Sequence, residues 1–108
     1  MVFLWHKPYH GLVEDISKIT KLREEIDRID EQLVALLNKR AQVSLKIRVA
    51  KGSSSIYRPE REAEVINNVT AASKGPLSGE AIATLFHTII YVCRSIQEVS
   101  LPEKAPRR

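Results

Sequence analysis

The feature that most constrains the fold is an apolar stripe that runs for about 30 residues without a glycine or a proline. Up to Lys51, apolar residues recur at alternating steps of four and three, which places them on one face of an α-helix. With position 40 as an interruption, the stripe consists of Leu22, Ile26, Ile29, Leu33, Leu36, Val43, Ile47 and Ala50. The sequence therefore predicts one helix over about 17–51, which Gly52 and the three serines after it should end.

Two further helices are predicted after this stop. Pro59 suits the first turn of a helix over 59–73, because its fixed φ matches the helix and the missing N–H needs no partner there. Gly75 ends that helix, and Ser78 is a candidate N-cap for a third helix over 78–99. The predicted fold class is all-α, with three helices.

The 108 residues correspond to a single domain, expected over 17–101. Residues 1–16 are predicted to be an irregular N-terminal arm, and residues 102–108 a disordered basic tail. The net charge is +4, but this tail, with one acidic and three basic side chains, supplies +2 of it, so we expect no nucleic-acid partner. No apolar run reaches the roughly 20 residues of a membrane helix, so no membrane partner is expected.

The only cysteine, Cys93, excludes an internal disulfide and a cysteine-based zinc site. A reducing, cytoplasmic location is the expectation that follows. Cys93 lies on the apolar stripe of the third helix, and no histidine lies at a partnering motif. This pattern is typical of a small core residue rather than of a nucleophile.

The length of the first helix predicts a second copy of the chain. A helix of about 30 residues is about 45 Å long, and the two shorter helices can cover only part of it. An apolar stripe sustained over four heptads therefore favours pairing with another such helix. We expect an all-helical homodimer.

Arg40 interrupts the stripe at a core position, where an unpaired guanidinium is very costly and must meet an anion. Lys51 follows on the same face, about 20° away around the helix and about 16 Å along it. The two side chains can lean toward each other and hold a small dianion. The alternative is that Arg40 pairs with a buried acid and that Lys51 only follows the helix dipole.

Arg23 lies on the edge of the same helix, about 25 Å from Arg40, too far to reach the Arg40–Lys51 region within its own chain. If two first helices pair antiparallel, Arg23 of the partner lies opposite that region. The ordinary alternative is an exposed arginine paired with Asp27.

Two side chains of the shorter helices are further candidates. Gln97 follows Cys93 by one helical step, and either borders the apolar stripe or points a neutral amide into a polar pocket. Glu62 lies in the first turn of the second helix. It either responds to the helix dipole or accepts a hydrogen bond from a ligand hydroxyl.

Together these positions resemble the all-helical chorismate mutases, and are most similar to the mutase domain at the N-terminus of bifunctional mutase–prephenate dehydratases. The resemblance covers residues 20–98. The segments that carry it are Leu22 to Asp27, Asp30 to Leu33, Leu36 to Arg40, Lys51, Tyr57 to Glu62, Lys74 to Leu77 and Phe86 to Gln97.

This resemblance implies an intertwined homodimer of three-helix chains with two shared active sites. It also implies the Claisen rearrangement of chorismate to prephenate, on the way to phenylalanine and tyrosine. The family reaction needs no metal, no cofactor and no covalent intermediate, so none is expected here.

The resemblance also implies a role for each polar position. Arg40 would bind the ring carboxylate of chorismate, and Arg23 of the partner subunit its side-chain carboxylate. Lys51 would contact the latter carboxylate and the ether oxygen, and Gln97 would donate to the same oxygen. Glu62 would accept a hydrogen bond from the ring hydroxyl.

Two positions depart from the family pattern. Arg58 stands where several members have an aspartate, so only its backbone is expected to bind near the hydroxyl. Cys93 stands where some members have a serine that holds the ring carboxylate, and a thiol is a weaker donor. Arg61 is expected at the periphery of the site.

Two other functions fit parts of the same pattern. An isochorismate pyruvate-lyase would share the fold and the cationic residues, although Glu62 favours the mutase. A non-enzymatic helical dimer would need none of the polar positions.

Overall fold

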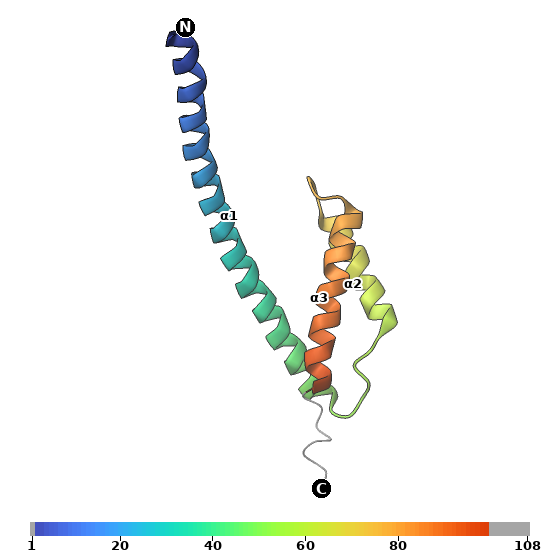
Figure 1. The fold of residues 1–108 in the computed structure, drawn as a ribbon. Helices are drawn as coiled ribbons and strands as arrows, with labels where there is room; N and C mark the ends of the chain where they lie inside the picture. Colours follow the sequence, from blue (N-terminus) through green and yellow to red (C-terminus); the bar gives the residue numbers. More distant parts are fainter. Residues whose placement is uncertain (1, 100–108) are drawn as a thin grey trace. The chain divides into compact units, whose positions relative to one another are not determined.

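The computed structural model describes the backbone of residues 2–99 and the side chains of residues 15–99. It contains three helices in the order α1 (Val2–Lys51), α2 (Pro59–Ala72) and α3 (Gly79–Val99), with no strand in the described residues (Figure 1). The predicted all-α class and the three-helix order are confirmed. The chain divides into two units, Met1–Leu36 and Leu37–Arg108, and α1 crosses the boundary between them. The tail predicted for 102–108 lies outside the described residues.

The end of α1 is set by Gly52, as the sequence predicts. Gly52 adopts a φ of 61°, in the left-handed region that glycine enters without strain. Its N–H donates to the Val49 carbonyl at 3.2 Å, and the N–H of Ser54 donates to the Lys51 carbonyl at 3.1 Å. The guanidinium of Arg48 donates to the Ser54 carbonyl at 3.0 Å. These bonds hold the start of the next loop against the last turn of α1 and so fix the position of Lys51.

The beginning of α1 differs from the prediction. The helix starts at Val2 rather than near Ser17, so the backbone of residues 2–16 is helical and not irregular. Pro8 and Gly11 weigh against a helix there, by about 3 and about 1 kcal/mol respectively. Both penalties are local, however, since a proline removes one backbone donor, and the helix continues through them. The division into an arm, a domain over 17–101 and a tail stays a prediction.

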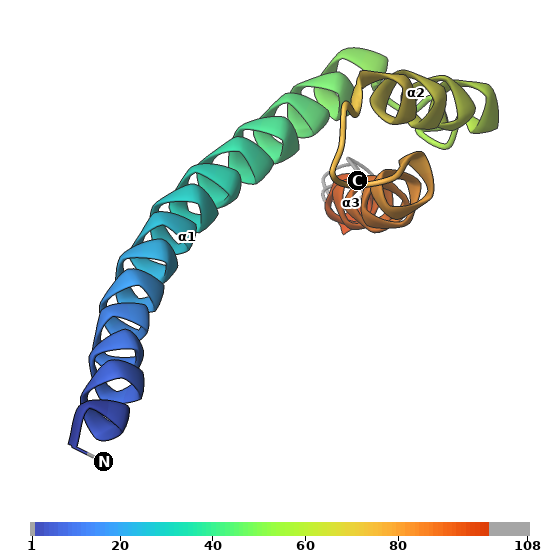
Figure 2. The ribbon, with the colours of Figure 1, turned by 90° about the horizontal axis from the view of Figure 1, so that it is seen from above.

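The helices α2 and α3 pack side by side in the second unit (Figures 1 and 2). Pro59 occupies the first turn of α2, as predicted. The hydroxyl of Ser78 accepts a hydrogen bond from the N–H of Ala81 at 3.0 Å, which confirms Ser78 as the N-cap of α3. Between the two helices, the Ser73 hydroxyl donates to the Leu77 carbonyl at 2.7 Å.

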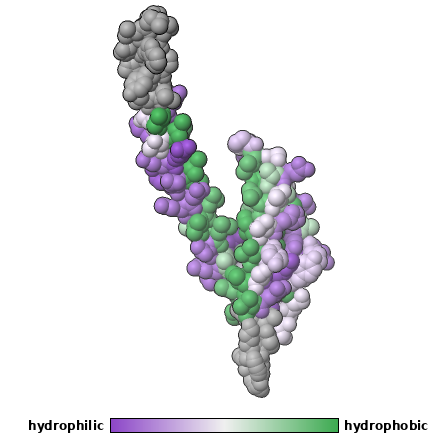
Figure 3. Space-filling model, in the orientation of Figure 1, coloured by the Kyte–Doolittle hydropathy of each residue, from purple (hydrophilic) through white to green (hydrophobic). Residues whose placement is uncertain are grey.

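Very little apolar surface is buried within a single chain. In the part of the chain whose side chains are described, the buried residues are Ser44, Arg48, Cys93 and Gln97, and of these only Cys93 is apolar. The stripe on α1 is exposed, with more than half of the surface of Leu22, Ile26, Ile29, Leu33 and Leu36 accessible. Apolar side chains run along the described part of α1 and gather over α3 (Figure 3).

A core of this size cannot offset the conformational entropy lost when three helices become ordered. The exposed stripe is therefore a surface that must be covered for the fold to be stable. None of the described helices combines enough length and apolar content to span a lipid bilayer.

Replacing Gly52 by alanine should destabilise the protein by about 1 kcal/mol, because an L-residue is strained at this positive φ. The strain is conformational, since no heavy atom lies within 4 Å of the added Cβ. The measurement is the midpoint of chemical unfolding at a fixed protein concentration.

Gly79→Ala is the matched control. The added Cβ meets only the Thr70 side chain at 3.5 Å, an ordinary contact, and the backbone there is not left-handed. We expect a change within about 0.5 kcal/mol. Equal losses in both variants would contradict the role assigned to Gly52.

Candidate active site

A pocket of about 590 Å³ lies within the Leu37–Arg108 unit. Its wall is built from the last three turns of α1, the loop that follows, the first turns of α2 and the C-terminal half of α3. Among the residues predicted for the site, six line this pocket: Arg40, Lys51, Arg58, Glu62, Cys93 and Gln97.

Positive charge exceeds negative charge around this pocket. Five basic and three acidic side chains line it: Arg40, Lys51, Arg58, Arg61, Arg94, Glu60, Glu62 and Glu64. Ion pairs join Arg61 to Glu64, at 3.2 Å, and Arg94 to Glu62. Among the described residues, three of the cations have no acidic partner: Arg40, Lys51 and Arg58.

Arg40 and Lys51 are both half-buried. The alternative in which Arg40 pairs with a buried acid is not realised in the described part of the chain. Partly buried cations are screened less by water and salt than exposed ones. The pocket is thus suited to a small anion with more than one negative charge. No group of metal-ligating side chains occurs among residues 15–99.

Gln97 is buried at the inner wall of the pocket. Its amide nitrogen donates to the Ser44 carbonyl at 2.7 Å, which joins α3 to α1. The amide nitrogen carries two hydrogens, and Ser44 accepts one of them. Cys93, one turn earlier on α3, is buried with a free thiol and also lines the pocket. The structure therefore places Gln97 inside the site rather than on the border of the apolar stripe.

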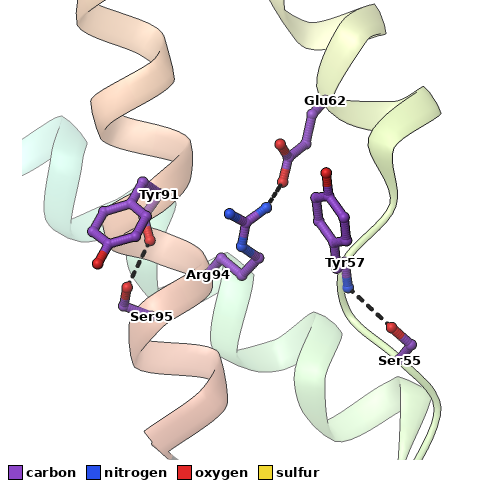
Figure 4. Close-up of polar contacts among 6 residues, drawn as sticks. All are labelled: Ser55, Tyr57, Glu62, Tyr91, Arg94 and Ser95. Carbon is purple, nitrogen blue, oxygen red and sulfur yellow. Dashed lines mark hydrogen bonds and ion pairs between the residues drawn. The ribbon is translucent and has the colours of Figure 1, made fainter.

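Glu62 lines the same pocket and forms a three-residue cluster with Arg94 and Tyr57 (Figure 4). Its Oε2 accepts a hydrogen bond from Nη1 of Arg94, and both side chains are half-buried. The guanidinium of Arg94 also lies over the ring of Tyr57, 4.5 Å from its centroid, a cation–π arrangement.

Arg23 belongs to the other unit, Met1–Leu36, where it lies on α1 and is exposed. No ion pair joins it to Asp27 in the described residues, so the ordinary alternative for Arg23 is not realised. Its predicted role in the site of a partner subunit stays a prediction.

Sequence reasoning missed Arg94 as a residue of the site. It lies three residues before Gln97, which puts the two on the same side of α3, and this spacing was the available signal. The buried position of Arg48 was also missed. Arg48 carries the same charge as the other bases of α1, and nothing local distinguishes it.

Comparison with known proteins identifies the family. A sequence model of chorismate mutase type II matches residues 22–98. The chain belongs to this family. The resemblance inferred from the sequence is thereby confirmed.

Two relatives of this chorismate mutase family member differ in how much of their own length matches this chain. The bifunctional chorismate mutase/prephenate dehydratase of Neisseria gonorrhoeae is 40% identical over 75 residues, which cover 69% of this chain and 21% of that protein. The intracellular chorismate mutase of Mycobacterium tuberculosis is 41% identical over 56 residues, 49% of this chain and 52% of that protein. The chain thus spans about a fifth of the length of the Neisseria relative.

Solved structures agree with this assignment to the family. The chorismate mutase from Helicobacter pylori in complex with prephenate matches with a TM-score of 0.72 and 35% identity, over 76% of this chain and 91% of that one. The chorismate mutase from Thermus thermophilus matches with a TM-score of 0.74 and 29% identity, over 77% and 97%.

The bond between Gln97 and Ser44 predicts a stability effect that is separate from catalysis. Gln97→Leu should destabilise the fold by about 1 kcal/mol, because it removes the buried hydrogen bond that joins α3 to α1. Glu98→Leu, at the exposed neighbouring position, is the control and should change stability by less than about 0.5 kcal/mol. The free energies of unfolding of both variants are measured from chemical unfolding curves. A Gln97→Leu protein as stable as its control would contradict the structural role.

Proposed function

We propose that the chain is a chorismate mutase that converts chorismate to prephenate, as a step in phenylalanine and tyrosine biosynthesis. Membership of the family supports the reaction. The observation that carries the proposal is the pair of half-buried cations, Arg40 and Lys51, which line one pocket without an acidic partner among the described residues. Chorismate is a dianion of suitable size for such a pocket.

The first contribution to catalysis is confinement. In the Claisen rearrangement one C–O bond breaks while one C–C bond forms, and both ends of the new bond belong to the same molecule. Arg40 binds the ring carboxylate and Arg23 of the partner subunit binds the side-chain carboxylate. Fixing both groups favours the compact, chair-like conformer in which the reacting carbons are close. Arginine suits this task because its planar fork can bind a carboxylate through two hydrogen bonds.

The second contribution is electrostatic. As the C–O bond breaks, negative charge builds on the ether oxygen. Lys51 and Gln97, from the ends of α1 and α3, donate to this oxygen and stabilise charge that exists mainly in the transition state. The amide of Gln97 is held in place by its bond to the Ser44 carbonyl. A donor that is already oriented loses no free energy by reorganising during the reaction.

Three further residues complete the proposed contacts. Glu62 accepts a hydrogen bond from the ring hydroxyl, and the backbone near Arg58 assists it. Cys93 lies close to the ring carboxylate as a weak donor. All three line the same pocket.

We further propose that two chains form an intertwined homodimer. The exposed apolar stripe of α1 and the nearly absent core of one chain support it. Antiparallel pairing of two stripes covers this surface and brings the partner's Arg23 to each pocket. The free, buried thiol of Cys93 is compatible with the cytoplasmic location that we also propose.

The test is the consumption of chorismate by the purified protein, with product identification. Prephenate supports the mutase. Release of pyruvate from isochorismate would instead identify the lyase, and no turnover of either compound would leave a non-enzymatic dimer.

Lys51→Ala should lower kcat by about a hundredfold or more, on the order of 3 kcal/mol of lost barrier reduction, because its charge acts on the transition state. Lys46→Ala removes the same charge from an exposed position on α1 outside the pocket and serves as the control. A near-normal rate for Lys51→Ala would refute the role of Lys51.

A further inference from the structure

The cluster of Arg94, Glu62 and Tyr57 joins three elements of the Leu37–Arg108 unit. Arg94 comes from α3, Glu62 from the first turn of α2, and Tyr57 from the loop between α1 and α2 (Figure 4). The Arg94 and Glu62 side chains are only 24% and 29% exposed. One arginine therefore contacts both the loop and the helix that close one side of the pocket.

The contact between Arg94 and Glu62 uses one oxygen of the carboxylate. Nη1 donates to Oε2. Among the described residues, Oε1 accepts no hydrogen bond, and Glu62 lines the pocket. A carboxylate held at one oxygen is restricted in rotation, while the other oxygen keeps its capacity to accept.

The Arg94–Glu62 contact also ties the first turns of α2 to α3. The N-cap residue, Arg58, makes no side-chain capping hydrogen bond. Within α2, Arg61 pairs with Glu64 and so holds nothing outside the helix. In the described part of the chain, the Arg94–Glu62 bond is the one side-chain hydrogen bond that ties the first turns of α2 to another helix.

The Arg94–Glu62 pair also changes the charge that a substrate would meet in the pocket. An unpaired Glu62 would repel a dianionic substrate and would compete with it for Arg40 and Lys51. Arg94 neutralises that charge locally, so that Arg40 and Lys51 stay available to the substrate.

We propose that Arg94 is a positioning residue, which fixes and neutralises Glu62 so that its second oxygen accepts the hydrogen bond of the substrate's ring hydroxyl. This inference rests on the proposed mutase function. Arg94 acts through Glu62 and does not contact the substrate, which distinguishes it from Arg40 and Lys51. Tyr57 supports it by packing against the guanidinium.

A double-mutant cycle tests this proposal. Arg94→Gln alone should lower kcat/KM for chorismate by about tenfold, equivalent to about 1.4 kcal/mol. In a Glu62→Gln background the same substitution should have little further effect, because Arg94 then has no carboxylate to position. Equal losses in both backgrounds would overturn the proposal, since Arg94 would then act on the substrate directly or on the fold alone.

Two further variants serve as controls, one for a possible folding defect of Arg94→Gln and one for the loss of a positive charge. Arg94→Lys keeps the charge but not the planar guanidinium, and should retain activity between those of the wild type and Arg94→Gln. If Arg94→Gln does not fold, the cycle is completed with Arg94→Lys, for which a smaller coupling of the same sign is expected. Lys74→Gln removes a charge from an exposed turn and should leave kcat/KM unchanged.

The activity of the wild-type protein distinguishes a failure of the proposed function from a failure of the role proposed for Arg94. If it does not convert chorismate, the proposed function is wrong and the role of Arg94 is wrong with it. If it converts chorismate and the losses in the cycle are additive, the proposed function stands and only the role of Arg94 is refuted.

Discussion

The free-energy cost of burying an unpaired guanidinium is the constraint on which the rest of this structure depends. Arg40 interrupts an otherwise apolar stripe and is half-buried with no acidic partner among the described residues. Such a side chain destabilises the protein unless an anion binds to it. Because Lys51 lines the same pocket, that anion is best a small molecule with two negative charges. The proposed binding of a dianionic substrate and the placement of charge along α1 would thus have one physical origin.

The other constraint is the lack of an apolar core. Cys93 is the single buried apolar side chain in the described part of the chain, while the stripe of α1 is exposed. A second copy that covers this stripe would supply the missing core and the missing arginine at once. Stability and catalysis would then depend on the same interface, and dilution of the dimer should weaken both.

Local signals were enough to predict much of the fold. Gly52, Pro59 and Ser78 act through backbone conformation and capping within one turn, so the helix boundaries they set were predictable. The start of α1 was not, because the local penalty of Pro8 does not reveal whether the helix continues through it. The pairing of Arg94 with Glu62 was also missed. It joins residues 32 positions apart, and sequence periodicity within one helix says nothing about a partner on another helix.

The most direct test of the central claim, an active site shared by two chains, is subunit complementation. Arg23→Ala and Arg40→Ala proteins, each nearly inactive alone, would be unfolded together in equal amounts and refolded. Random pairing makes about half of the dimers mixed, and each mixed dimer has one intact site of two. The account therefore predicts that chorismate turnover recovers to about a quarter of the wild-type level. Turnover that stays at the level of the separate variants would contradict it.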